Sequence, residues 1–177
     1  ISNYMKRRFS LDYKTDEIIV TVGGSEAIDI AIRTLVNPGD EVIIPAPFWV
    51  SYPEMIKYND GVPVILYTTE EKGFKFTAKE LEEAITSKTK ALVLNSPSNP
   101  TGMVYSEEEL REIAEVCLKH DLYIISDEIY EHLVYGSAKH VSIASFGEEI
   151  KERTIIVNGL SKTYAMTGWR IGFTASN

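Results

Sequence analysis

The feature that most constrains this chain is the alternation of short apolar, β-branched runs with amphipathic helical patterns. Strands are expected at 17–22, 41–45, 62–67, 90–95, 122–126 and 153–158, and helices at 23–36, 49–58, 77–85 and 106–120. The strand runs are almost continuously apolar, which is typical of strands covered on both faces. We therefore predict an α/β fold with a mostly parallel sheet flanked by helices on both faces, in three layers.

Composition places the chain among soluble, single-domain proteins. Its 177 residues are 44% hydrophobic and 25% charged, and no apolar run approaches the ~20 residues that cross a bilayer. A net charge of −8 argues against nucleic acid and anionic membranes as partners. The one cysteine, Cys117, lies in a helical pattern and is expected to be a buried thiol, which fits a reducing, cytoplasmic location.

Open α/β sheets bind ligands at the carboxyl ends of their strands, so the residues after each strand are candidates for a site. Gly24 and Ser25 begin a helix there and would present backbone amides to an anion. Trp49 would offer a flat wall, and Asn99, in the stiff loop SPSNPTG, a fixed amide. Taken singly, ordinary turn chemistry and core packing also explain these residues.

Ionisable residues follow the later strands. Asp127 ends an apolar run, where burying a carboxylate is costly without a cationic partner, and Tyr130 can reach the same space. Lys162 lies among small residues, where partial desolvation would favour the neutral amine that attacks carbonyl groups. Arg170 and Ser161 suit a phosphate. The structural alternatives are a helix-capping Asp127, a core Tyr130 and a surface Lys162.

Pyridoxal 5′-phosphate would use this whole set. It offers an aldehyde for a lysine, a phosphate for an anion site, a ring for stacking and a ring nitrogen that a carboxylate keeps protonated. A metal site is not expected, because His120, His132 and His140 lack metal-ligand spacing.

Several stretches resemble signatures of the class I pyridoxal-phosphate-dependent aminotransferases, in that family's order. The run GLSKTYAMTGWRIG, residues 159–172, resembles the cofactor-attachment signature, and SPSNPTG and SDEIY resemble two others. GGSEA and PFWVSY match as well, so the resemblance covers essentially the whole chain. Within the family, the motifs are most similar to those of aspartate aminotransferases. It implies that residues 1–177 form the large, cofactor-binding domain of a PLP-dependent transferase-like fold.

The resemblance also implies roles for the candidate residues. Lys162 would form a Schiff base with the cofactor and, once released, would shuttle a proton between the substrate Cα and the cofactor's C4′. Asp127 would pair with the pyridinium nitrogen. The remaining roles are phosphate binding by Gly24, Ser25, Ser161 and Arg170, ring stacking by Trp49, and contact with the 3-oxygen by Asn99 and Tyr130.

Some features of the family are not found in these residues. The family's small domain, its arginine for the substrate carboxylate and its N-terminal segment are not represented, so we expect an excerpt of a longer, homodimeric enzyme. Gly159 stands where many relatives carry a serine, which implies one phosphate contact fewer.

The expected reaction is transfer of an amino group from an amino acid, aspartate first, to a 2-oxo acid such as 2-oxoglutarate in a ping-pong cycle. An aromatic or alanine aminotransferase, a carbon–sulfur β-lyase and a non-catalytic PLP-binding regulatory domain stay open, because the residues that select the substrate side chain lie outside this sequence.

Overall fold

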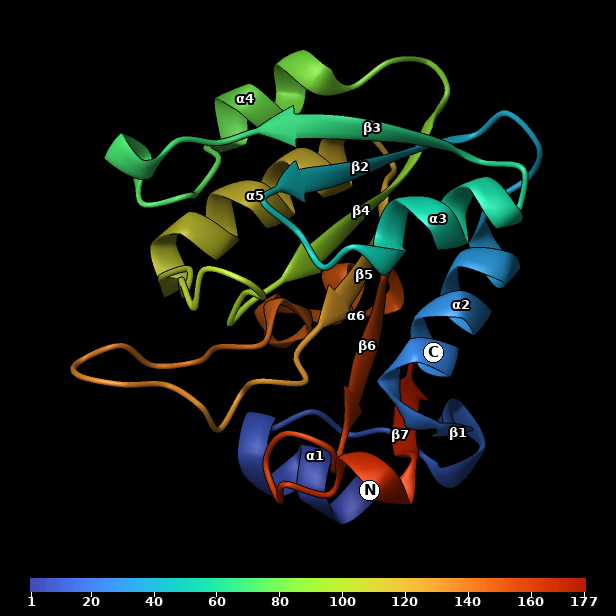
Figure 1. Ribbon diagram of the computed structural model, residues 1–177, viewed down its shortest axis with the longest axis vertical. Helices are drawn as coiled ribbons and strands as arrows, with labels where there is room; N and C mark the ends of the chain where they lie inside the picture. Colours follow the sequence, from blue (N-terminus) through green and yellow to red (C-terminus); the bar gives the residue numbers. More distant parts are fainter.

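The computed structural model describes residues 1–177 and arranges them as one sheet with helices on both faces (Figure 1). The strands are β1 (Ile18–Val22), β2 (Glu41–Ala46), β3 (Val62–Tyr67), β4 (Thr89–Asn95), β5 (Tyr123–Asp127), β6 (Thr154–Gly159) and β7 (Ile171–Ala175). Their order across the sheet is β1-β7-β6-β5-β4-β2-β3. Strands β2 to β6 are mutually parallel, and only β7 runs against its neighbours β1 and β6. The predicted, mostly parallel sheet is confirmed.

Six α-helices flank this sheet. They are α1 (Ser2–Phe9), α2 (Gly23–Leu35), α3 (Ser51–Tyr58), α4 (Ala78–Ala84), α5 (Glu107–Lys119) and α6 (Glu148–Glu152). The start of α4 has a reciprocal cap: Thr77 Oγ1 accepts from the Glu80 amide at 3.2 Å, and Glu80 Oε2 accepts from the Thr77 amide at 2.9 Å. This pairing satisfies two backbone donors that a helix start leaves free.

Successive residues of a strand pack into two separate cores, one on each face of the sheet. Ile43 on β2 packs with α4 and α5, whereas its neighbour Ile44 packs with α2 and α3 on the opposite face. This alternation follows from the two-residue period of a strand and explains why the strands read as unbroken apolar runs. The expected buried thiol, Cys117, lies in the first of these cores.

A third, smaller core seats α1 against β6 and β7. Met5 of α1 packs with Ile156 of β6 and with Phe173 and Ala175 of β7. Helix α1 therefore lies beside the end of the sheet where the chain leaves β6 (Figure 1).

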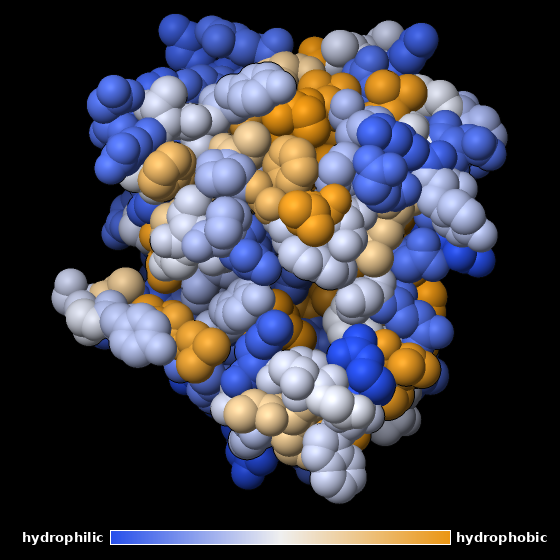
Figure 2. All heavy atoms as spheres, viewed as in Figure 1, coloured by the Kyte–Doolittle hydropathy of each residue, from blue (hydrophilic) through white to orange (hydrophobic).

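The edge strands are less covered than the centre. Every residue of β3 is partly or fully exposed, and apolar side chains gather around β2 and β3 in the view of Figure 2. On β1, at the other edge, Val20 and Val22 are exposed. None of the helices has both the length and the apolar character that crossing a bilayer demands.

Candidate functional site

One cavity of about 190 Å³ gathers the residues that the sequence singled out. It lies at the carboxyl ends of the parallel strands, where α2 begins. All nine candidates line it: Gly24, Ser25, Trp49, Asn99, Asp127, Tyr130, Ser161, Lys162 and Arg170. Their roles toward a ligand stay predictions, but their convergence from six separate segments is a feature of the fold.

The parallel register explains this convergence. Asn95 at the end of β4 is level with Asp127 at the end of β5, and Asp127 is level with Val157 of β6. The loops that follow these strands therefore leave the sheet side by side. Asn95 also fixes the next loop, because its Oδ1 accepts from the Asn99 amide at 2.7 Å while its Nδ2 donates to the Asp127 carbonyl at 2.9 Å.

Asp127 is the buried acid of the site. Burial raises the pKa of its carboxyl group to about 6, although hydrogen bonds from the Tyr52 hydroxyl and the Ile129 amide oppose the rise. Tyr52 Oη donates to Oδ2 at 2.6 Å, and the Ile129 amide donates to Oδ1 at 3.2 Å. The neighbouring Glu128 raises the pKa slightly, and Lys162 lowers it. Such a carboxylate is suited to pair with a cationic ligand group.

A second polar group lies across the cavity. Asn99 Nδ2 donates to Tyr130 Oη at 3.4 Å, so the loop after β4 and the turn after β5 present an amide and a phenol together. The amine of Lys162 lies 5.6 Å from the centre of the Tyr130 ring. These three side chains therefore share one small region of the cavity.

The other end of the cavity suits an anion. The hydroxyl of Ser161 is buried and has no hydrogen-bond partner, and it lies in the same lining as the first turn of α2. The guanidinium of Arg170 packs so closely on Gly23 that a Cβ there would lie 2.2 Å from Nη2. An unpartnered buried donor, a cation and a helix N-terminus together favour a phosphate or carboxylate.

The expected desolvation of Lys162 is wrong for this chain. Its side chain is exposed, in the turn of residues 160–166 that follows β6.

Trp49 and Tyr52 form the wall on the α3 side. Their rings meet edge to face, with centres 5.4 Å apart and planes at 83°. Trp49 is partly buried, so its side chain belongs neither to the core nor to the fully exposed surface. A flat ligand ring could be held against it.

Sequence reasoning missed two residues of this site. Tyr52 was not singled out, although it follows Trp49 by three positions, the spacing that places two side chains on the same face of a helix. Gly23 was passed over for Gly24, yet Gly23 is the one that Arg170 packs against. The signal for Gly23 is tertiary, because the arginine lies 147 residues further along the chain.

Gly159 has a packing explanation. It pairs with Gly172 across β6 and β7, and a Cβ at Gly159 would lie 2.7 Å from the Ile171 carbonyl oxygen. A Cβ at Gly172 would lie 2.4 Å from the backbone of Gly23. The two strands and the start of α2 therefore approach each other at glycines.

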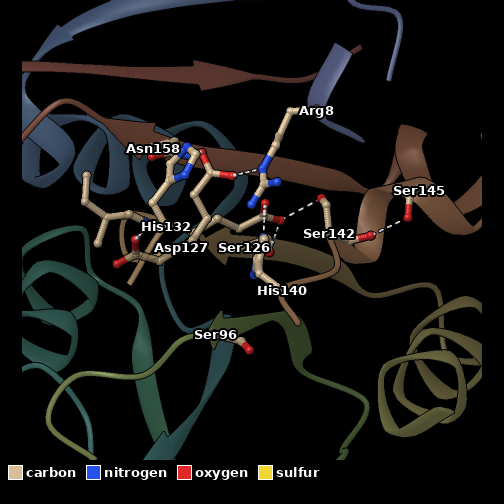
Figure 3. Close-up of polar contacts among 12 residues, drawn as sticks. Arg8, Ser96, Ser126, Asp127, His132, His140, Ser142, Ser145 and Asn158 are labelled. Atoms are coloured by element: carbon tan, nitrogen blue, oxygen red, sulfur yellow. Dashed lines mark hydrogen bonds and ion pairs between the residues drawn. The ribbon is translucent and has the colours of Figure 1, made fainter. Parts of the chain in front are cut away.

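Beneath the cavity, buried carboxylates hold the turn that follows β5 (Figure 3). Glu128 accepts from Ser126 Oγ at 2.9 Å and from Ser142 Oγ at 2.7 Å, and its other oxygen pairs with His140 Nε2 at 3.0 Å. The side chain of His140 is buried. His120 pairs with Glu82 on the far side of the molecule.

The family described as Aminotransferase class I and II matches residues 1–177. The aspartate aminotransferase of Bacillus sp. (strain YM-2) is 54% identical over 172 residues, which are 97% of this chain and 44% of that protein.

Solved structures agree with the sequence match. The chain resembles the aspartate aminotransferase of Rhizobium meliloti with a TM-score of 0.96 and 42% identity, over 99% of this chain and 44% of that one. It resembles the aromatic aminotransferase of Pyrococcus horikoshii OT3 with a TM-score of 0.96 and 44% identity, over 99% and 47%. The chain thus spans a little under half the length of these relatives.

Proposed function

The chain belongs to the class I and II aminotransferase family, whose members depend on pyridoxal 5′-phosphate, and from this premise we propose that it is the large, cofactor-binding domain of an aminotransferase. The reaction would move an amino group from an amino acid to a 2-oxo acid. The observation that carries the proposal is the meeting of the Lys162 amine, the Asp127 carboxylate and the unpartnered Ser161 hydroxyl in one cavity.

The residues present fit this cofactor. A buried serine hydroxyl without a partner, the Arg170 guanidinium and the first turn of α2 match a phosphate. A carboxylate whose burial calls for a cation matches a protonated ring nitrogen. Trp49 supplies a wall for a flat ring. When bound, pyridoxal phosphate supplies an aldehyde for amines and a protonated ring that takes up the electron pair released at the substrate Cα.

The chain's own residues would then hold and move protons. Asp127, held by Tyr52 and the Ile129 amide, would keep a proton on the ring nitrogen. Lys162 Nζ would take the proton from the substrate Cα as a general base, since the exposed turn leaves its amine free to move in the cavity. Asn99 and Tyr130 would hold the ring oxygen, and Ser25 and Ser161 would orient the phosphate.

Aspartate, with 2-oxoglutarate as acceptor, is the substrate that we propose. The names of the Bacillus and Rhizobium relatives support it. An aromatic amino acid is the second candidate, because the Pyrococcus enzyme named for that activity superposes equally well. The residues that line the cavity suit the cofactor that both classes share and do not discriminate between their side chains.

We also propose a homodimer in the cytoplasm. Exposed apolar side chains support association: Val50 is 76% exposed and Tyr58 is 78% exposed. A single, buried, free cysteine is compatible with a reducing compartment. Light scattering of the purified protein would test the association.

The direct test adds pyridoxal phosphate to the purified protein, reduces it with borohydride and maps the modified peptide by mass. We expect one pyridoxyl group on Lys162. Lys162→Ala should abolish it, whereas Lys139→Ala, at another exposed lysine, should not. Adducts scattered over surface lysines would contradict the proposed site. Product analysis then separates reactions, because transamination needs a 2-oxo acid whereas β-elimination releases ammonia and pyruvate without one.

A further inference from the structure

Glu131 is a buried carboxylate that the proposed chemistry does not use. Its side chain is 2% exposed, and it lies one residue after Tyr130, just outside the cavity. Burying a carboxylate is costly unless donors surround it, so its partners indicate what it is for.

Two segments of the chain, α1 and the end of β6, contact this one carboxylate. Tyr4 Oη of α1 donates to Oε1, and Asn158 Nδ2 at the end of β6 donates to the same oxygen at 3.0 Å. Arg8, one turn after Tyr4, forms an ion pair with its Nε 3.5 Å from Oε2, and Oε2 itself accepts no hydrogen bond. Figure 3 shows Arg8, His132 and Asn158 in the same part of the close-up.

Asn158 carries the connection toward Lys162. Its Nδ2 is committed to Glu131, and its Oδ1 accepts from the Gly159 amide at 2.7 Å. Gly159 is the last residue of β6, and Lys162 follows three positions later. Fixing both ends of the Asn158 amide therefore fixes the direction in which the chain leaves the sheet toward the lysine.

Backbone hydrogen bonds hold the lysine turn. Within it they run from Tyr164 to Leu160, from Met166 to Ser161 and from Ala165 to Lys162, and at its start the Leu160 amide donates to the Ile171 carbonyl of β7 at 3.0 Å. The position of such a turn depends on how its first residue is anchored.

We propose that Glu131 is a positioning residue: it clamps α1 to the end of β6 through Tyr4 and Asn158 and thereby sets the position of the Lys162 turn. The role that it serves, presenting Lys162 to a carbonyl group, rests on the proposed function. The clamp itself is a property of the folded chain and can be measured without cofactor.

The test measures amide hydrogen exchange at residues 159–166 in the cofactor-free protein. Glu131→Met keeps the side-chain length and removes Oε1, the oxygen that accepts from Tyr4 and Asn158, so exchange there should rise about tenfold. Glu131→Gln keeps one acceptor oxygen and should retain most of the protection. The matched control is Glu128→Met, which removes another buried carboxylate whose side-chain partners are Ser126, Ser142 and His140. It should leave residues 159–166 unchanged.

A double-mutant cycle adds a second criterion. Asn158→Ala should also speed exchange of the turn, and Glu131→Met added to it should have clearly less than its full effect, because the two side chains share one contact. Additive effects, or faster exchange spread evenly over the whole sheet, would overturn the clamp. If either Glu131 variant fails to fold, Tyr4→Phe and Asn158→Ala decide the matter by the same measurement.

The cofactor provides an independent readout. In the clamp variants, the rate at which pyridoxal phosphate is trapped on Lys162 by borohydride should fall about tenfold relative to the unchanged protein. No trapping on Lys162 in the unchanged protein would contradict the proposed function, and hydrogen exchange would still decide the clamp. Normal trapping in Glu131→Met, together with unchanged exchange, would overturn the clamp and leave the proposed function standing.

Discussion

Tyr52 Oη donates a hydrogen bond to Asp127 Oδ2 at 2.6 Å, and both side chains are buried. Burial raises the pKa of the phenol well above its ordinary range, with the Asp127 charge adding to the rise, so Tyr52 acts as a neutral donor. This bond lowers the pKa of Asp127 against the effect of burial. The tyrosine therefore helps to keep the acid ionised where a ring nitrogen would need it.

Removing that donor should weaken cofactor binding. In Tyr52→Phe the pKa of Asp127 should rise further, so that a larger fraction of it is protonated near neutral pH. The dissociation constant of pyridoxal phosphate at pH 7, measured by absorbance titration, should increase about tenfold. Tyr105→Phe is the matched control, because Tyr105 is equally buried but meets the Phe76 amide on the other face of the sheet. Equal affinities of the two variants would contradict the role of Tyr52.

The raised pKa of Asp127 predicts a pH dependence of stability. Its folded value of about 6 lies above the ordinary value of 3.8, so between these pH values the folded protein holds a proton that the unfolded chain has released. The free energy of unfolding should therefore fall as the pH rises through this window, by on the order of 3 kcal/mol. Urea unfolding of the cofactor-free protein at pH 4, 5, 6 and 7 measures it.

Asp127→Asn isolates this contribution from that of the other titrating groups. The Tyr52 hydroxyl can accept as well as donate, so it can pair with the amide that replaces the carboxylate. The difference in the free energy of unfolding between the unchanged protein and Asp127→Asn should change across pH 4–6 and stay constant above pH 6. A difference that is level throughout would mean that Asp127 titrates at its ordinary value.

The two glycines at the start of α2 should respond differently to substitution. A Cβ at Gly23, which has a φ of +80°, would lie 2.2 Å from Arg170 Nη2, whereas a Cβ at Gly24 would lie 3.5 Å from Ile129 Cδ1. Gly23→Ala should displace the guanidinium and weaken the binding of pyridoxal phosphate about tenfold. It should change the affinity for pyridoxal, which lacks the phosphate, much less.

Gly24→Ala is the control for this prediction, because its added methyl group makes an ordinary contact. It should retain the affinity for pyridoxal phosphate within a factor of about three. An equal loss of affinity for pyridoxal and its phosphate in Gly23→Ala would place the damage in the fold instead of the anion site.

The sequence by itself determined the layers and the position of the site. Unbroken apolar strand runs indicate a parallel sheet that is covered on both faces, and the carboxyl ends of parallel strands bring the following loops to one edge. Local chemistry was readable too, because the cap formed by Thr77 and Glu80 depends on residues three apart.

Only the tertiary structure decided how the site residues are supported. The tyrosine donors to Asp127 and Glu131 come from segments 75 and 127 residues away, and no periodicity in the sequence records such a distance. The same holds for Arg170 against Gly23 and for Gly159 against Gly172. The exposure of Lys162 shows the reverse case. Small flanking residues suggested desolvation, but burial depends on which parts of the fold cover a side chain, and the side chain of Lys162 is exposed.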